Sequence, residues 1–180
     1  LFIFVLLIII PCYIAQGMAN FTYGNEAVAN SPGTPVYEAE QQMNAAYGKS
    51  NMMIALVPPD SNITEKKMTE EIDDLSYVKY ALSLSSVLPE GIPEDFLPEN
   101  ITSLMHSKNW ARVIINVRSA GESDDAFKFS DNIRAIIDKY YPNETTYLVG
   151  VTPSTQDIKD IIVPDYNRVN IVSLLGVALV

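Results

Sequence analysis

Residues 111–151 read ARVIINVRSAGESDDAFKFSDNIRAIIDKYYPNETTYLVGV, and this segment carries the clearest pattern of strands and helix in the chain. The segment 111–119 alternates between two faces, one of which carries the apolar residues Ala111, Val113, Ile115 and Val117, and this predicts a strand. The segment 124–141 repeats apolar residues at steps of three and four and carries acids in its first turn, which predicts an amphipathic helix. The run TYLVGV at 146–151 is short and apolar, as is typical of a buried strand.

The preceding part of the chain has the same order of elements. Residues 51–57 (NMMIALV) predict a strand, and residues 78–87 (VKYALSLSSV) predict another. Between them, Asn62 followed three residues later by Glu65 resembles a capping box that starts a helix. The order strand, helix, strand, strand, helix, strand predicts an α+β fold, a ferredoxin-like βαββαβ domain built from two right-handed crossover units.

Flanking segments extend this domain. Residues 36–47 have an apolar helical stripe and are followed by Gly48, which predicts a helix that ends there. Residues 89–98 are rich in proline and acids and predict a loop, and a short helix is expected at 100–107. We therefore place the domain at residues 36–153, after an irregular exit segment at 16–35.

The two ends of the chain differ from its middle. Residues 1–15 and 169–180 carry no charge, so the net charge of -10 belongs entirely to the part between them. The two runs cover about 22 Å and 18 Å as helices, less than the ~30 Å of a bilayer core, and we interpret them as truncated transmembrane helices. Residues 154–180 are expected to form a helix that starts at Ser154, kinks or restarts at Pro164 and leads into the next transmembrane helix. Two buried terminal core helices are the alternative.

Composition excludes several classes of protein. A pI near 4.4 and the absence of a long basic cluster argue against nucleic acid as a partner. The single cysteine, Cys12, allows neither a disulfide scaffold nor a cysteine-rich zinc site. The single histidine, His106, has no serine or cysteine at a sequence spacing that would indicate a nucleophile–base pair. We therefore expect no enzymatic activity, no metal site and no cofactor.

The position of residues 16–168 relative to the membrane is expected to be extracytoplasmic, in a multi-pass protein of the cell membrane. The acidity of this part is compatible with that side, although a loop of this length is translocated largely regardless of charge. Four Asn-x-Thr triplets are potential glycan acceptors, and Asn62 and Asn100 also fit helix N-caps. The triplets begin at Asn20, Asn62, Asn100 and Asn143.

The face of the sheet away from its helices supplies the candidate site. Arg112, Asn116 and Arg118 alternate onto that face, where two cations could meet an anionic headgroup or pair with a neighbouring subdomain. Tyr80 and Trp110 are expected to border the same surface or to pack at the edge of the core.

The order of parts resembles the extracytoplasmic porter domain of the resistance-nodulation-division (RND) superfamily, and most closely the MMPL-type transporters of bacteria. The resemblance rests on the segment Tyr47-Gly48-Lys49-Ser50-Asn51, the βαββαβ order, and TYLVGVTPSTQDIKDIIVPDYNRVN at 146–170. The exit at Phe21-Thr22-Tyr23-Gly24 is more similar to the second of that family's two porter domains.

This resemblance implies a proton-driven exporter of lipids, drugs or peptides. Its partners would be the bilayer at both termini, a second porter domain and further transmembrane helices of the same polypeptide, and a lipid or hydrophobic small-molecule substrate. The family's intramembrane proton-relay acids have no counterpart here. A two-helix membrane sensor with an extracellular ligand-binding domain satisfies the same pattern, as does a surface scaffold or adhesion protein, and the sequence downstream of Val180 would discriminate between them.

Overall fold

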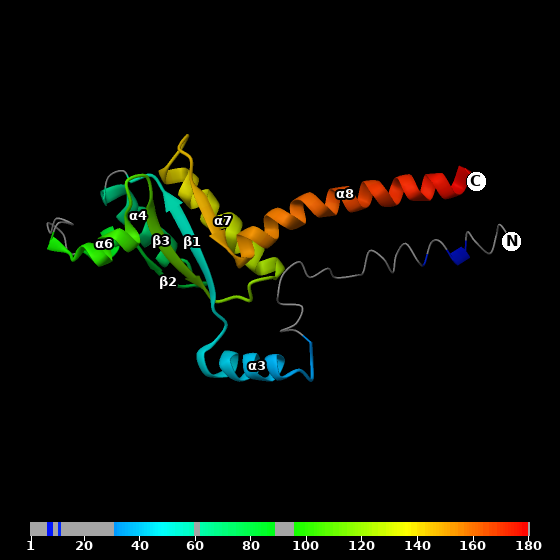
Figure 1. Cartoon of the computed structure of the whole chain (residues 1–180), viewed down its shortest axis with the longest axis horizontal. Helices are drawn as coiled ribbons and strands as arrows, with labels where there is room; N and C mark the ends of the chain where they lie inside the picture. Colours follow the sequence, from blue (N-terminus) through cyan, green and yellow to red (C-terminus); the bar gives the residue numbers. More distant parts are fainter. Residues whose placement is uncertain (1–6, 9–10, 12–30, 60–61, 89–95, 180) are drawn as a thin grey trace.

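A four-stranded antiparallel sheet organises the chain in the computed structural model, which describes residues 7–8, 11, 31–59, 62–88 and 96–179 (Figure 1). The strands are β1 (Asn51–Val57), β2 (Val78–Leu82), β3 (Ala111–Val117) and β4 (Tyr147–Gly150). Their order in the sheet is β2-β3-β1-β4, and every neighbouring pair is antiparallel. The predicted α+β class and the predicted succession of strands and helices are therefore confirmed.

Helices α4 (Asn62–Asp73) and α7 (Asp124–Tyr140) form the second layer. β1 and β3 bury alternate residues beneath this layer, as in β3, where Val113, Ile115 and Val117 are fully buried. Beyond the core, Lys139 on α7 donates to the Glu71 carboxylate on α4 at 2.7 and 2.8 Å. The helices thus cover one face of the sheet and leave the other open. The core comprises Met53, Ala55, Val57, Met68, Ile72, Val78, Ala81, Ala111, Val113, Ile115, Val117, Ile133, Ile137 and Tyr141.

The second strand is shorter than the sequence predicts. We expected residues 78–87, but β2 ends at Leu82 and a short helix, α5 (Leu84–Val87), follows. Ser83 and Ser86 form a capping box, in which each side chain accepts the other residue's backbone N–H at 2.9 and 3.1 Å. Serine competes for backbone groups in this way at helix starts, and the apparent alternation of residues 83–87 concealed it.

The helix predicted at 36–47 is present as α3 (Pro35–Tyr47), but it has no buried residue. Thr34 caps its start by accepting the Tyr37 N–H at 3.2 Å, and Gly48 ends it with φ 74°. Among the described residues its apolar stripe does not pack against the domain, since Val36 and Met43 are more than half exposed. In Figure 1, α3 lies apart from the sheet.

A long helix, α8 (Val151–Leu179), follows β4 directly. The helix was expected to begin at Ser154, and it begins three residues earlier because Gly150 alone makes the turn. It continues through Pro164 and does not restart there. Among the described residues, no helix combines the length and apolar character that crossing a bilayer requires. The predictions for residues 1–15 and 16–30 lie outside the described residues, apart from residues 7, 8 and 11.

A buried polar cluster fixes the start of α8 to the sheet. The Asn51 amide donates to the Thr152 hydroxyl at 2.7 Å, and that hydroxyl donates to the Gly121 carbonyl. The same amide lies 3.3 Å from the Ser119 hydroxyl and 3.4 Å from the Ala120 carbonyl. One side chain therefore connects the beginning of β1, the loop after β3 and the beginning of α8. A buried network of this kind holds its members in one arrangement.

The short helix α6 (Glu99–Met105) precedes β3, and its bounds differ by one and two residues from those of the helix predicted at 100–107. The described residues of the connection before it begin at Phe96, and the earlier part of the predicted loop lies outside the described residues.

Candidate functional site: the open face of the sheet

The face of the sheet opposite α4 and α7 is mainly apolar, and we call it the open face. In the register of the sheet, Leu82 pairs with Ile114, Ile114 with Ile54, and Ile54 with Val149. An unbroken apolar row therefore crosses all four strands. The open face comprises Met52, Ile54, Leu56, Tyr80, Leu82, Arg112, Ile114, Asn116, Tyr147 and Val149.

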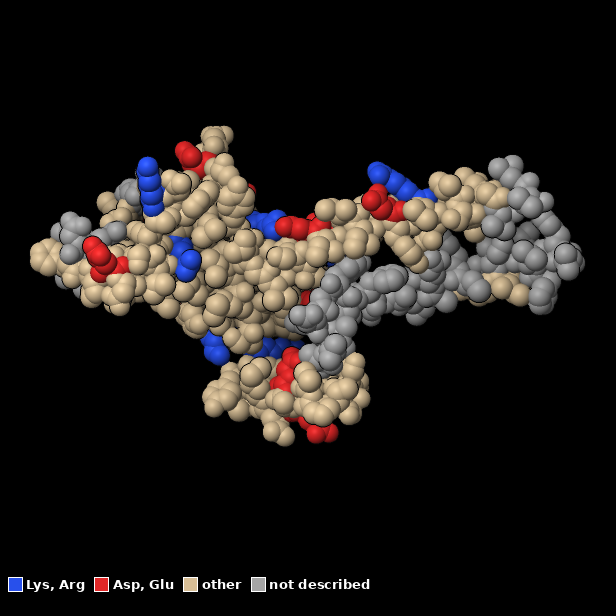
Figure 2. Space-filling view, in the orientation of Figure 1, with Lys and Arg blue, Asp and Glu red and all other residues tan. Residues whose placement is uncertain are grey.

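Several of these apolar side chains meet solvent. Met52 is 52% exposed, Tyr147 49%, and Leu82 and Val149 42% each. In the view of Figure 2, the surface over the strands is largely uncharged. Contiguous exposed apolar surface is typical of a contact site for a protein, a lipid or a ligand.

Asn116 lies on the predicted face, but its side chain is covered, since it is only 5% exposed. Its side-chain amide donates to the Ser50 hydroxyl at 2.9 Å and to the Tyr80 hydroxyl at 3.3 Å. Ser50 returns a hydrogen bond to the Asn116 amide oxygen at 3.1 Å. Ser50 and Tyr80 cover the Asn116 amide, so the three side chains form a hydrogen-bonded cluster at one end of the open face.

Arg112 and Trp110 lie toward the other end of the open face. Trp110 packs edge-on against Tyr147, with ring centroids 5.3 Å apart and an angle of 63° between the rings. Arg112 is exposed, and within the described part of the chain it makes no ion pair. The charge of Arg112 is therefore available to a partner.

Arg118 is not part of this surface in the way the alternation predicts. It lies one residue beyond β3, its backbone N–H donates to the Tyr77 carbonyl at 2.8 Å, and its guanidinium reaches the Ser76 carbonyl at 3.4 Å. The five intervening residues of extended chain place the Cα atoms of Arg112 and Arg118 about 20 Å apart. The two cations therefore lie toward opposite ends of β3, and their role toward an anionic headgroup or a neighbouring subdomain stays a prediction.

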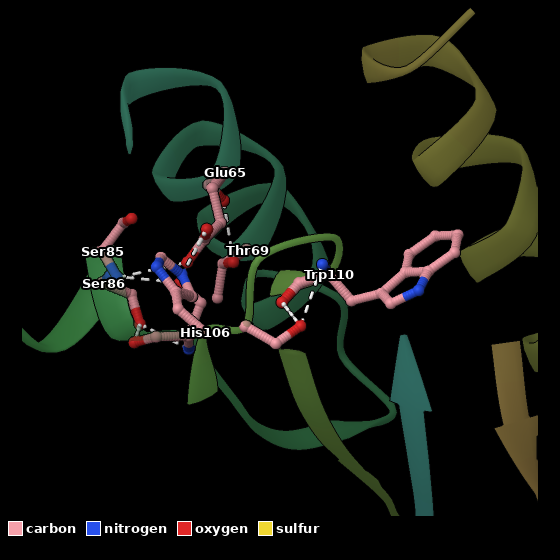
Figure 3. Close-up of polar contacts among 8 residues, drawn as sticks. Glu65, Thr69, Ser85, Ser86, His106 and Trp110 are labelled. Atoms are coloured by element: carbon pink, nitrogen blue, oxygen red, sulfur yellow. Dashed lines mark hydrogen bonds and ion pairs between the residues drawn. The ribbon is translucent and has the colours of Figure 1, made fainter. Parts of the chain in front are cut away.

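Sequence reasoning missed a second polar cluster, at the junction of α4, α5 and α6 (Figure 3). Glu65 was expected to cap α4, but its side chain is 4% exposed and accepts from His106 and from the backbone N–H of Ser85. The Glu65 Oε2 to His106 Nε2 distance is 2.9 Å, and the Ser85 N to Glu65 Oε1 distance is 3.2 Å. Nothing local in the sequence signals a pair 41 residues apart.

The Glu65 carboxylate is held ionised by its neighbours. Burial by itself would raise its pKa, but the hydrogen bond and charge of His106, with the Ser85 hydrogen bonds, lower the pKa of Glu65 below its ordinary value. These hydrogen bonds connect the end of α6 to α4 and α4 to α5. Glu65 and His106 thus have a structural function, as a buried ion pair when the imidazole is protonated.

Metal chemistry has no support in the described residues, where no group of three or more His, Cys, Asp or Glu side chains is placed to hold an ion. No protein-family model and no curated protein matches the chain.

Proposed function

We propose that the chain is a ferredoxin-like extracytoplasmic domain of an RND-type membrane exporter, in which the open face contacts a second domain of the same polypeptide. The observation that carries this proposal is the direct continuation of edge strand β4 into α8, with no intervening loop. A helix joined to a sheet in this way transmits movement between the membrane and the contacts of the sheet. The Asn51 and Thr152 hydrogen bond stiffens that connection.

The outer part of α8 supports a membrane at that end. The helix is about 43 Å long, and its apolar residues between Val169 and Leu175 are exposed. Residues 169–179 contain no charged side chain. A helix segment that is apolar around its circumference is stable when buried in protein or lipid. The exposed members are Val169, Ile171, Val172, Leu174 and Leu175.

The open face supports a domain contact. An antiparallel sheet with one layer of helices commonly exposes polar side chains on its free face, whereas here a row of four apolar residues crosses that face. Arg112 at its end offers one charge to an acidic neighbour. The expected substrates remain lipids or hydrophobic small molecules, which such a domain pair would enclose.

Efflux of ethidium from energised cells that express the parent protein tests the proposal. Met52→Glu places a charge on the open face at a half-exposed position, and we expect it to reduce efflux at least about tenfold while the protein remains in the membrane. Ile63→Glu is the matched control, since Ile63 is 65% exposed on α4, away from the open face. A protonophore should abolish efflux by the unaltered protein. An efflux rate that changes neither with the protonophore nor with Met52→Glu contradicts the proposal.

A further inference from the structure

The Asn-x-Thr triplets occur more often than composition explains. The chain has thirteen asparagines and nine threonines, which at random would give fewer than one such triplet, and it has four. All four have threonine in the third position and none has serine. Asn20 lies outside the described residues, and the other three can be placed in the fold.

All three described acceptor asparagines are exposed. Asn62 is the first residue of α4, Asn100 is the second residue of α6, and Asn143 lies in the turn after α7 with φ 71°. By contrast, the fully structural asparagines Asn51 and Asn116 are buried and belong to no triplet. Each acceptor side chain therefore has space for a bulky, hydrated group.

The three acceptors also share one end of the sheet. Asn62 follows the end of β1 at Val57, α6 precedes the start of β3 at Ala111, and Asn143 precedes the start of β4 at Tyr147. The register pairs Val57 with Ala111 and Leu56 with Tyr147, so these strand ends are neighbours. We call this end of the sheet the distal pole.

The chain leaves for α3 and α8 at the opposite end. Asn51 begins β1 there, and Gly150, which pairs with Met53, ends β4 there. In Figure 1, α6 and the turn between α7 and β4 lie on the side of the domain away from the outer end of α8. The acceptors are thus separated from the proposed membrane end by about the length of the strands, roughly 20 Å.

Exposed apolar residues accompany two of the acceptors. Ile63 beside Asn62 is 65% exposed, and Ile101 beside Asn100 is 44% exposed. Leu104, one turn further along α6, is 62% exposed. A glycan attached next to these side chains would shield them from other molecules, whereas a protein contact at the distal pole would have to exclude the glycan.

We propose that Asn62, Asn100 and Asn143 are N-glycosylated, so that the distal pole carries sugar and contacts between domains are confined to the open face. The proposal rests on the extracytoplasmic position in the proposed function. In the reaction, the Asn amide nitrogen bonds to the anomeric carbon of a lipid-pyrophosphate-linked oligosaccharide. The bond from that carbon to the pyrophosphate oxygen breaks, the lipid pyrophosphate leaves, and the amide nitrogen loses one proton.

Translation of the full chain with endoplasmic reticulum microsomes tests this. The background variant is Asn20→Gln, which leaves the three described triplets. We expect three stepwise increases in mass that peptide-N-glycosidase removes, and the loss of one step in each of Asn62→Gln, Asn100→Gln and Asn143→Gln. Thr64→Val, Thr102→Val and Thr145→Val keep the asparagines and should each lose the same step.

A control acceptor separates the two proposals. Pro32→Thr turns Asn30-Ser31-Pro32 into an acceptor triplet outside the sheet domain. Modification of this control without modification of Asn62, Asn100 and Asn143 overturns the glycan proposal and leaves the extracytoplasmic position intact. A chain in which neither the control nor the three native triplets are modified overturns both.

Discussion

At the scale of single residues, the buried carboxylate of Glu65 makes stability depend on pH. Because the folded-state pKa of Glu65 lies below its unfolded value near 4.5, its contribution is present above that value and is lost as the pH falls through the folded pKa. We expect the melting temperature of the chain to fall between pH 5 and pH 3. In Glu65→Gln this acid dependence should be weaker. The variant should also be less stable at pH 7 by about 1–3 kcal/mol, since a buried partner of His106 is lost.

Thermal unfolding followed by circular dichroism across this pH range provides the measurement. Glu38→Gln is the matched control, because Glu38 is an exposed acid on α3, a helix with no buried residue. The control should keep the acid dependence of the unaltered chain. Equal acid dependence in Glu65→Gln and the unaltered chain would show that the buried pair does not govern it.

At the scale of elements, the junction of β4 with α8 depends on a glycine. Gly150 has φ 150°, and a Cβ there would lie 2.8 Å from the Met52 carbonyl oxygen and 3.2 Å from the Met53 Cα. Both contacts are with backbone, so neither can yield by rotating a side chain. We expect Gly150→Ala to lower the free energy of unfolding by about 1–3 kcal/mol.

Gly176→Ala is the comparison for this prediction. Gly176 lies within α8 and has nothing within 4 Å of its Cβ position, so alanine should be neutral or stabilising there, by up to about 1 kcal/mol. Urea unfolding of both variants measures the difference. A Gly150→Ala variant as stable as Gly176→Ala would mean that β4 does not approach β1 at Met52 as described.

The elements that the sequence predicts well are those whose signal is local. The strand at 51–57 and the helix at 124–141 were predicted within one residue, because burial repeats at their own period along the chain. The end of β2 was predicted wrongly, because Ser83 and Ser86 form a capping box where the alternation appeared to continue. The start of α8 was misplaced because a single glycine made a turn for which the sequence suggested several residues.

The candidate site was predictable only in part. Alternation along β3 correctly assigned Arg112 and Ile114 to one face, since that depends on the strand alone. The burial of Asn116 depends on Ser50 and Tyr80, which come from two other segments. The pairing of Glu65 with His106 depends in the same way on three helices meeting. Long-range polar contacts of this kind leave no periodic trace in one sequence.

At the scale of the whole molecule, stability is concentrated in the middle of the sheet. β1 is hydrogen-bonded on both sides, to β3 and β4, and β3 is bonded on both sides, to β1 and β2. Their inward side chains are fully buried, whereas α3 has no buried residue. Besides the connecting residues 48–50, α3 meets the sheet where Lys79 on β2 donates to the Tyr47 carbonyl at 3.1 Å. Local opening is cheapest where few buried contacts are lost. The molecule should therefore behave as a stable sheet carrying a weakly held helix.

Amide hydrogen exchange of the full chain tests this distribution. We expect the slowest exchange in β1 and β3, intermediate exchange in the edge strands β2 and β4, and the fastest exchange in α3, at least about a hundredfold faster than in β1. The backbone amide of Ala81 should exchange more slowly than other amides of the edge strands, because it donates to the Asp73 carboxylate at 2.6 Å. Asp73→Asn should preserve the sheet and speed exchange at Ala81 more than at the centre of β3. Uniformly rapid exchange, or an α3 as protected as β1, would contradict the arrangement of layers on which the open face depends.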